Sequence, residues 1–286
     1  MVRSSQRLTS WLESWIGNMT ERSPMTVRCE TRIHPTAIVH ADAQVGEGVQ
    51  IDPWVVIGPQ VTIGAGTRIG PRVLIERDTL VGEDCTIGNG AALGTDAQDM
   101  KYRGEPATLE IGDRTVIREF ATLNRGTAAS GKTVVGSDCL LMAYVHVAHD
   151  CELGNHVILS NAVNMGGHVL IEDWAIVGGL TPIHQFVRIG AHAFVGGGSR
   201  ISQDVPPYCR AAGNPPRLFG LNSVGLERRG LSDEVRKALK KAYRILFKSD
   251  ASLSKALSRA DEEIQGIPEV RHLIEFIRAS ERGITT

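Results

Sequence analysis

Four histidines in the middle of the chain stand close to one another and to a carboxylate. His146 and His149 are three residues apart, Asp150 follows His149 directly, and His168 and His184 come next. A neutral imidazole exchanges its proton near physiological pH and can therefore take a proton from a hydroxyl group. An adjacent carboxylate can hold the ring or stabilise its cation. The pattern indicates general-base catalysis, with His149 as the base and Asp150 as its partner.

Two other roles are open for the same histidines. His146 and His149 could bind zinc, but they stand closer together than the paired histidines of γ-class carbonic anhydrases, so we expect no metal. Each histidine could also be structural, with its ring nitrogens satisfied by backbone hydrogen bonds at a turn. That role is favoured for any single histidine and disfavoured for the cluster as a whole.

A six-residue repeat predicts the elements that position these histidines. Large aliphatic residues recur every six positions over residues 33–93, 111–123 and 135–201. A smaller residue follows four positions later, and glycine often comes directly after the large aliphatic, which would let the chain turn a tight corner. A period of six matches neither an α-helix nor an isolated strand. It predicts a prism in which each hexad forms one strand and one turn, and three hexads form a coil of 18 residues.

The coil length places the chemistry on one edge of the prism. One coil after His149 comes Gly167, immediately before His168, and His184 follows 16 residues after His168. We therefore expect His149, His168 and His184 to line the same edge, with His146 one strand step away. A backbone amide near Gly167 could stabilise the oxyanion that forms when a hydroxyl attacks a thioester.

Two stretches interrupt the repeat, residues 94–110 and residues 124–134. An insertion into a regular solenoid must project as a loop, and such loops usually carry binding function. Both loops are therefore predicted to take part in binding.

The repeat ends near Asp204, and helical patterns follow. No further regular coils are expected, because four prolines come next: Pro206, Pro207, Pro215 and Pro216. Ser232 is a predicted helix N-cap, and apolar helical faces follow within residues 235–246, 253–264 and 270–277. The predicted organisation is an N-terminal extension of residues 1–30, a solenoid of residues 31–205 and a helical domain of residues 206–286.

One predicted helix carries a basic face. Its members are Arg236, Lys237, Lys240, Lys241, Arg244 and Lys248. A solvated helix face and a docking site for an acidic partner are both consistent with this charge.

Residues 1–30 do not fit the repeat, although they contain an apolar helical face. That face is formed by Leu8, Trp11, Leu12, Trp15 and Ile16. It could be an interfacial anchor or part of a targeting segment. An accessory helix, or an upstream start codon with Met19 or Met25 as the true start, is the simpler interpretation.

Composition excludes several classes of protein. The formal net charge is -1, so there is no general attraction to nucleic acid. No apolar stretch approaches the roughly 18–20 residues that span a bilayer, so no transmembrane segment is expected. The five cysteines lack CxxC spacing, which favours a reduced, cytoplasmic compartment. Cys85, Cys139 and Cys151 fall at the small inward position of the repeat and are predicted to be small hydrophobes.

Several motifs together resemble one family. They are HisValAlaHisAsp (146–150), GlyGlyHisVal (166–169), HisGlnPhe (184–186), GlnAspMetLysTyrArgGlyGluPro (98–106), GlnAspValProPro (203–207) and GlyLeuGluArgArgGly (225–230). From about residue 31 to its end, the chain resembles the acyl-ACP:UDP-N-acetylglucosamine O-acyltransferases that open lipid A synthesis. The resemblance implies an all-β solenoid, a left-handed parallel β-helix of hexapeptide repeats, with a small α-helical C-terminal domain. It also implies a homotrimer with active sites between neighbouring prisms.

The resemblance implies the reaction and its partners. An (R)-3-hydroxyacyl chain would move from acyl carrier protein to the 3-hydroxyl of UDP-N-acetylglucosamine. No cofactor is expected, because the acyl donor is carried on the phosphopantetheine of acyl carrier protein.

The resemblance also assigns roles to individual residues. His149 would be the general base, Asp150 would orient it, and Gly167 would supply the oxyanion amide. Sugar, phosphate or acyl chain would be positioned by His146, His168, His184 and Gln185. Asp99 and Lys101, on the first loop, would reach substrate bound at a neighbouring subunit. The nucleotide end would be served by Asn222, Arg228 and Arg229. Carrier protein would dock on Lys237, Lys240, Lys241 and Arg244.

Acyl chain length is expected to depend on Gly197, at the far end of the acyl groove. A glycine leaves room there, which predicts a long chain, on the order of fourteen carbons by analogy.

Three positions depart from the family pattern, namely Asn124, Val224 and Pro215, where histidine, an acidic residue and histidine are familiar. These departures leave open a 3-amino sugar as the acceptor. Three further alternatives are the related N-acyltransferase of the same pathway, a metalloenzyme of the γ-carbonic-anhydrase type and a non-catalytic scaffold. The N-acyltransferases usually carry a separate N-terminal domain, for which 30 residues are too few.

Overall fold

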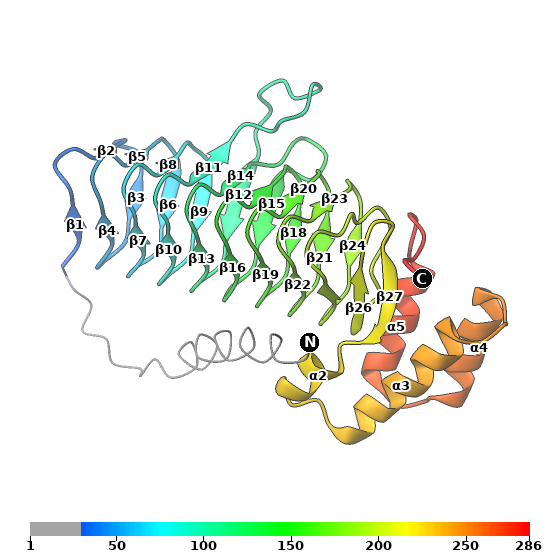
Figure 1. Cartoon of the computed structure of the whole chain (residues 1–286). Coiled ribbons are helices and arrows are strands. Elements are labelled where there is room, and N and C mark those ends of the chain that lie inside the picture. The colour runs from blue at the N-terminus through cyan, green and yellow to red at the C-terminus, as the bar shows by residue number, and fades with distance from the viewer. Residues whose placement is uncertain (1–29) are drawn as a thin grey trace.

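The computed structural model describes residues 30–286, and their main body is a three-sided prism of short parallel strands (Figure 1). The chain runs in turn through three sheets, which we call A, B and C. Sheet A contains β1 (Arg32–Ile33), β4 (Gln50–Ile51), β7 (Arg68–Ile69), β10 (Thr86–Ile87), β13 (Val116–Ile117), β16 (Leu140–Leu141), β19 (Ile158–Leu159), β22 (Ile176–Val177), β25 (Phe194–Val195), β26 (Cys209–Ala212) and β27 (Arg217–Leu221).

The other two sheets have eight strands each among the described residues. Sheet B contains β2 (Ile38–Val39), β5 (Val56–Ile57), β8 (Leu74–Ile75), β11 (Ala92–Thr95), β14 (Thr122–Asn124), β17 (His146–Val147), β20 (Asn164–Met165) and β23 (Pro182–Ile183). Sheet C contains β3 (Gln44–Val45), β6 (Val61–Ile63), β9 (Thr79–Val81), β12 (Thr108–Ile111), β15 (Lys132–Val135), β18 (Glu152–Leu153), β21 (Leu170–Ile171) and β24 (Arg188–Ile189).

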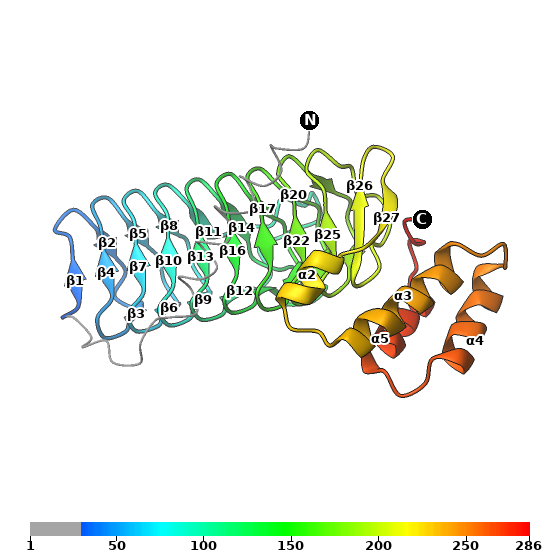
Figure 2. The same cartoon turned by 60° about the horizontal axis from the view of Figure 1, so that its bottom comes forward.

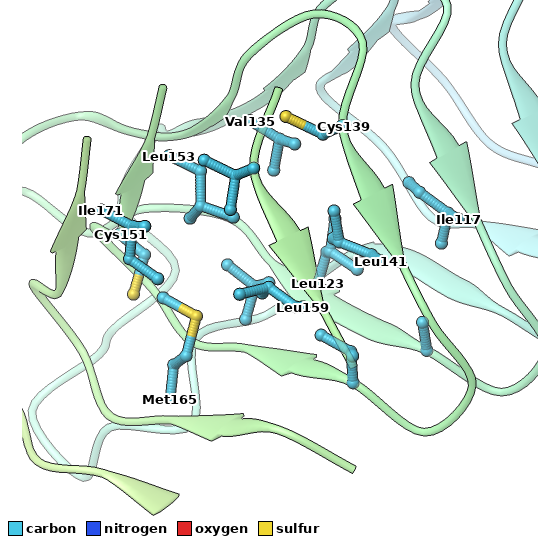
Figure 3. Close-up of a cluster of buried hydrophobic side chains, with 14 of the residues drawn as sticks. Ile117, Leu123, Val135, Cys139, Leu141, Cys151, Leu153, Leu159, Met165 and Ile171 are labelled. Atoms are coloured by element: carbon cyan, nitrogen blue, oxygen red, sulfur yellow. The ribbon is translucent and has the colours of Figure 1, made fainter. Parts of the chain in front are cut away.

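The strand register confirms the predicted coil. Ile33 pairs with Ile51, and Ile158 pairs with Ile176, so equivalent residues of neighbouring coils are 18 positions apart. The large aliphatics of the repeat point inward and stack in rows, as Figure 3 shows for Leu141 and Leu159. Both side chains are fully buried, and burial of a side chain of this size contributes about 1.5–3 kcal/mol. A long prism is therefore stable with a narrow core and few aromatic residues.

The predicted role of the inward cysteines is confirmed. Cys85, Cys139 and Cys151 are buried free thiols, and the latter two are seen in the core of Figure 3. Burial raises the pKa of the Cys85 thiol to about 11 and those of Cys139 and Cys151 to about 12. These thiols are therefore packing groups and not nucleophiles.

The glycines of the repeat have a different role from the one predicted. The tight corners are made mostly by non-glycine residues with positive φ, such as Asp150 and His168. Glycines that follow the inward aliphatic instead allow close approach of the next coil. A Cβ at Gly58 would lie 1.7 Å from the carbonyl oxygen of Glu76. These positions exclude side chains because the coils stack at strand spacing.

The prism has three edges, each named after the two sheets that it joins. Both insertions leave the B–C edge, where the chain passes from sheet B to sheet C, and the first rises well above the prism (Figure 1). The loops span residues 96–107 and 125–131, and are shorter than the predicted 94–110 and 124–134. The loops are shorter because β12 and β15 pair over four residues. The pairs run from Thr108 with Lys132 to Ile111 with Val135.

Sheet A continues past the predicted end of the coils. β26 pairs in parallel with β25, and β27 returns antiparallel to β26. The prolines permit this because Pro206 and Pro207 precede β26, whereas Pro215 and Pro216 lie in the turn before β27. None of them has to donate a hydrogen bond within the sheet.

Four helices follow within the described residues, of which the first lies against the side of the prism and the other three lie beyond its end (Figure 2). They are α2 (Ser223–Arg228), α3 (Asp233–Phe247), α4 (Leu253–Glu263) and α5 (Pro268–Arg278). Ser232 caps α3 as predicted, since its hydroxyl accepts a hydrogen bond from the amide of Val235 at 3.3 Å. Leu239, Leu257 and Leu273 join the three longer helices in one apolar cluster.

The helix predicted near the start of the chain, on Leu8, Trp11, Leu12, Trp15 and Ile16, lies outside the described residues. Within residues 30–286, no helix has the length and apolar character required to cross a membrane.

Candidate active site

His149 and Asp150 form a hydrogen-bonded pair at the B–C edge, directly after β17. Nδ1 of His149 lies 2.7 Å from Oδ2 of Asp150, and the Asp150 side chain has no exposed surface. An ionised carboxylate can only accept hydrogen bonds, so Nδ1 carries the proton and donates it. Nε2 is then left with a free lone pair. This is the tautomer that a general base requires.

The 125–131 loop holds the carboxylate of this pair. Oδ1 of Asp150 accepts hydrogen bonds from the amide of Thr127 at 2.9 Å and from the hydroxyl of Ser130. The Thr127 hydroxyl donates to Oδ2 at 2.8 Å. Burial alone raises the pKa of the Asp150 carboxyl, but hydrogen bonds from Ser130, Thr127 and His149 outweigh it and lower the pKa to about 2. Asp150 therefore stays ionised beside His149.

Gly167 lies directly against the imidazole of His149. A Cβ at Gly167 would lie 2.5 Å from Cε1 and 2.8 Å from Nε2 of the ring. Its amide has no hydrogen-bond partner among residues 30–286. On the C–A edge, the corresponding amide of Ser137 is capped by Oδ1 of Asn155 at 2.9 Å. The free amide of Gly167 is therefore available to an oxygen atom beside Nε2.

His168 is the second histidine of the same edge. Its ring meets His149 edge to face with centroids 5.2 Å apart, and its Nε2 lies 3.7 Å from Oδ2 of Asp150. The other face of His168 stacks on Phe186 at 4.6 Å. The corner after β23 brings His184 to the same edge. The prediction that His149, His168 and His184 share one edge is thus confirmed.

The remaining polar groups near the pair are less buried. His146 projects from β17, and its Nδ1 lies 2.7 Å from the hydroxyl of Thr122. Burial, followed by the charge of His149, lowers the pKa of His146. His184 and Gln185 are exposed, and Nδ1 of His184 lies 3.1 Å from the Gln185 carbonyl oxygen. These side chains can reach a ligand that lies along the edge.

The same cluster can be tested as a metal site. One potential ligand atom from each of His149, Asp150 and His168 lies within 4.8 Å of the others. Two ligands of one tetrahedral zinc ion are about 3.4 Å apart, given bonds of about 2.0–2.1 Å. His149 Nδ1 and Asp150 Oδ2 are 2.7 Å apart and share a hydrogen bond instead. The donor set therefore fits proton transfer better than metal binding.

Asp99 and Lys101 lie on the 96–107 loop, which leaves the same edge. Oδ1 of Asp99 accepts a hydrogen bond from the amide of Lys101 at 2.9 Å, and the Lys101 side chain is exposed. No contact joins either side chain to His149 in this chain. The loop is anchored by Arg125, which is 1% exposed and donates to the Gly94 carbonyl oxygen and to Asp96.

Asn222 and Arg229 lie on a different edge from His149. The Arg229 guanidinium stacks 3.9 Å above the ring of Trp174, at the C–A edge. Burial lowers the pKa of Arg229, and its donors have no hydrogen-bond acceptor among the described residues. Asn222 caps α2 and donates to the His192 carbonyl oxygen at 3.0 Å. Arg228 is exposed at the end of α2. One subunit thus does not bring the predicted nucleotide residues to its catalytic pair.

Gly197 lies on the third edge, between sheets A and B, together with other glycines. Gly178 and Gly179 stand there one coil earlier, and Gly196 and Gly198 flank Gly197. A Cβ at Gly197 would lie 3.1 Å from the Gly179 carbonyl oxygen. The glycines of this stretch leave room at the edge, although the exposed side chain of Leu180 follows Gly179 there.

The basic face of α3 is exposed as predicted, but its lysines differ in whether an acidic residue pairs with them. Lys237, Lys240 and Arg244 are exposed to solvent. Lys241 forms an ion pair with Glu263 of α4 at 2.9 Å, so part of its charge is already compensated.

Sequence reasoning missed Thr127, Ser130 and Arg125 as members of the site. The only signal for them was the interruption of the repeat at 124–134, which indicates a loop and not the direction in which its side chains point. Asn124 also belongs to this network, since its amide donates to the Asp96 carbonyl oxygen at 2.8 Å.

Comparison with known proteins follows the two parts of the chain. The model described as bacterial transferase hexapeptide (six repeats) matches residues 42–77, 60–97 and 132–166. The model described as Udp N-acetylglucosamine O-acyltransferase, domain 2, matches residues 204–285. A relative from Myxococcus xanthus (strain DK1622), named acyl-[acyl-carrier-protein]--UDP-N-acetylglucosamine O-acyltransferase, is 52% identical over 193 residues, which cover 67% of this chain and 75% of the relative. This chain belongs to the UDP-N-acetylglucosamine O-acyltransferase family.

Solved structures of the family agree with this assignment. LpxA from Acinetobacter baumannii has a TM-score of 0.86 at 43% identity, over 89% of this chain and 99% of that one. LpxA from Bacteroides fragilis, described as a UDP-N-acetylglucosamine acyltransferase, has a TM-score of 0.87 at 43% identity, over 89% and 100% of the two chains. The predicted fold, a left-handed parallel β-helix with a small helical C-terminal domain, is confirmed.

Proposed function

We propose that this chain transfers an (R)-3-hydroxyacyl group from acyl carrier protein to the 3-hydroxyl of UDP-N-acetylglucosamine, the step that opens lipid A synthesis. Membership of the O-acyltransferase family supports the reaction. The observation that carries the mechanism is the His149–Asp150 pair, whose free Nε2 lies beside the unpartnered amide of Gly167.

The base acts on the sugar hydroxyl. Nε2 of His149 removes the proton as the hydroxyl oxygen attacks the thioester carbon, and the imidazole becomes a cation. Asp150 stabilises that cation through the hydrogen bond at Nδ1. A positioned base of this kind contributes typically about 10²–10⁴-fold in rate.

The Gly167 amide acts on the thioester. Attack converts the carbonyl oxygen into an oxyanion, which accepts a hydrogen bond from this N–H. The intermediate then collapses, the bond from carbon to sulfur breaks, and the leaving thiolate takes the proton from His149. The products are the acylated sugar nucleotide and the free phosphopantetheine thiol, and no further cofactor is needed.

A homotrimer explains why the functional residues lie on different edges. The catalytic pair lies on the B–C edge, whereas Arg229 and Asn222 lie on the C–A edge. Neighbouring prisms would bring these two edges together, so that one subunit supplies the base and another binds the diphosphate and uridine. The exposed Asp99 and Lys101 would reach the neighbouring site in the same way. The enzyme would act in the cytoplasm, where its carrier protein and sugar nucleotide are found.

Acyl chain length provides the first prediction. Because Gly197 and its neighbouring glycines leave room at this edge, wild-type enzyme should prefer a long donor, on the order of fourteen carbons. Gly197→Met should shift the optimum to a shorter chain, since each excluded methylene costs about 1–3 kcal/mol. Both enzymes are assayed with hydroxyacyl carrier proteins of increasing chain length, and the product masses give the preferred length of each. Gly197→Ala is the control. A wild-type optimum near ten carbons would contradict the prediction.

Docking of acyl carrier protein on α3 provides the second prediction. Lys237→Glu/Lys240→Glu should raise KM for acyl carrier protein about tenfold at low ionic strength, with a smaller effect at high salt. Lys241 is left intact because its reversal would also break the ion pair with Glu263. The matched control, Lys255→Glu/Arg271→Glu, changes the charge equally on α4 and α5. Equal KM values for the two variants at low salt would rule out docking on α3.

One assay tests the proposed function as a whole. Purified protein is incubated with a ladder of hydroxyacyl carrier proteins and either UDP-N-acetylglucosamine or its 3-amino analogue, and products are identified by mass spectrometry. Transfer to the hydroxyl sugar is expected. Turnover of the amino sugar alone would reassign the acceptor, and no turnover of any carrier substrate would refute the proposal.

A further inference from the structure

The 125–131 loop directs its polar groups inward, toward Asp150. The residues at its tip that face solvent are Ala128, Ala129 and Ser130, and the two alanine methyl groups cannot recognise a polar substrate. The hydroxyl groups of the loop belong to Thr127, which is 8% exposed, and to the exposed Ser130, and both contact the Asp150 carboxylate. Both hydroxyl groups are therefore engaged by Asp150.

We propose that Thr127 and Ser130 are positioning residues, which fix the Asp150 carboxylate and thereby set the orientation and basicity of His149. The inference rests on the proposed function, in which His149 is the general base. It concerns the groups that contact the Asp150 carboxylate of the catalytic pair.

The hydrogen bonds on the carboxylate carry this inference. Oδ2 accepts from His149 Nδ1 at 2.7 Å and from the Thr127 hydroxyl at 2.8 Å. Oδ1 accepts from the Thr127 amide at 2.9 Å, from the Ser130 hydroxyl and from the Ser130 amide at 3.3 Å. A carboxylate has about four lone-pair sites. All of them are used, so the group can neither rotate nor take up a proton without losing a bond.

The Thr127 hydroxyl is held toward Asp150 more firmly than the Ser130 hydroxyl. Its hydroxyl accepts a hydrogen bond from the amide of Ala129 at 3.2 Å, so its single proton is free to point at Asp150. The Ser130 hydroxyl has a second acceptor, the Lys132 carbonyl oxygen at 2.8 Å, which competes for its proton. The amide of Gly131 donates to the Thr127 carbonyl oxygen at 2.8 Å and closes the loop on itself. We therefore expect Thr127 to have the larger effect.

The charged and titratable groups that face the pair are few among the described residues. His168 approaches Asp150 at 3.7 Å, and His146 lies near His149 on β17. From the first loop, Glu105 accepts a hydrogen bond from the amide of Ala128 at 3.4 Å. These groups remain in place when the Thr127 hydroxyl is removed, so a change in the pH profile can be assigned to Asp150.

Thr127→Val tests the proposal, because valine keeps the shape of threonine and removes the hydroxyl. With one donor fewer, the carboxylate becomes a stronger acceptor for His149 Nδ1 and favours the imidazolium form. The base must be neutral to act, so the acid limb of the kcat/KM profile should move to higher pH. We expect kcat to fall about 10–100-fold, the usual effect of losing a group that orients a catalytic side chain. KM should change little.

Three further variants make the result specific. Thr127→Ser keeps the hydroxyl and should restore both kcat and the acid limb, and Ser130→Ala should give a smaller shift in the same direction. Thr115→Val removes a buried hydroxyl that donates to the Gly136 carbonyl oxygen at 2.8 Å on another edge, and should leave the profile unchanged. An acid limb that does not move in Thr127→Val, or that moves equally in Thr115→Val, would overturn the proposal.

A second measurement separates this inference from the proposed function. The pH dependence of the His149 imidazole signals can be followed by NMR in wild-type, Thr127→Val and Thr127→Ser proteins without any turnover. A titration of His149 that moves to higher pH in Thr127→Val but not in Thr127→Ser supports the positioning role even if no acyl transfer is found. Identical titrations in all three proteins would refute it even if the enzyme is active.

Discussion

The His149→Ala variant is expected to lose about 10²–10⁴-fold in kcat while its KM for UDP-N-acetylglucosamine stays close to the wild-type value. Alanine removes the only group within residues 30–286 that combines a free imidazole nitrogen, a buried carboxylate partner and an adjacent unpartnered amide. A general base acts in the transition state, so kcat and kcat/KM should fall together.

The structural cost of this variant should be small. His149 is at a corner of the coil and does not belong to the inward rows, so the core of the prism keeps its packing. The oligomeric state and the melting temperature are therefore expected to remain near those of wild type. The kcat of Asp150→Asn should also fall, because the asparagine amide can donate a hydrogen bond to Nδ1. That bond favours the tautomer in which Nδ1 lacks the proton and Nε2 carries it.

The control is a histidine of the prism that lacks a buried carboxylate partner. His40 is exposed near the start of the prism, and its neighbouring carboxylate, Asp42, is exposed as well. His40→Ala should keep full activity. A folded His149→Ala protein that retains near-wild-type acyl transfer would refute the assignment of the base, whatever the result for His40.

How much the sequence predicts depends on whether a feature follows the repeat. Leu141 and Leu159 are 18 positions apart, and that period alone places them in one inward row. The same arithmetic places Gly167 one coil above His149, which the contact between Gly167 and the imidazole confirms. Local periodicity suffices here because every coil is built on its predecessor.

Features outside the repeat could not be predicted in the same way. Thr127 and Ser130 contact Asp150, which lies 23 and 20 residues further along the chain, because an insertion folds back over the edge. The direction of that fold depends on the closure of the loop, which no periodic pattern encodes. Arg229 is a similar case, since its stacking on Trp174 depends on how α2 returns to the prism.

Gly167→Ala is expected to lower kcat by about 10²-fold, because the added methyl group displaces the general base. A Cβ at this position would lie 2.5 Å from Cε1 of His149, so the imidazole has to move away. Misplacement of a reacting group by about 1 Å can cost about 10²-fold. The methyl group would also occupy the space beside Nε2, where the substrate oxygen must lie. Measurement of kcat under saturating substrate tests this directly.

Backbone strain is not a competing explanation for such a loss. Gly167 is outside the left-handed region of φ, so alanine can adopt its conformation. Gly197→Ala is the matched control, since it also adds a methyl group at an edge of the prism, 3.1 Å from the Gly179 carbonyl oxygen but away from His149. With a short acyl donor it should retain most of its activity. If Gly167→Ala is as active as this control, the imidazole does not need its place against Gly167.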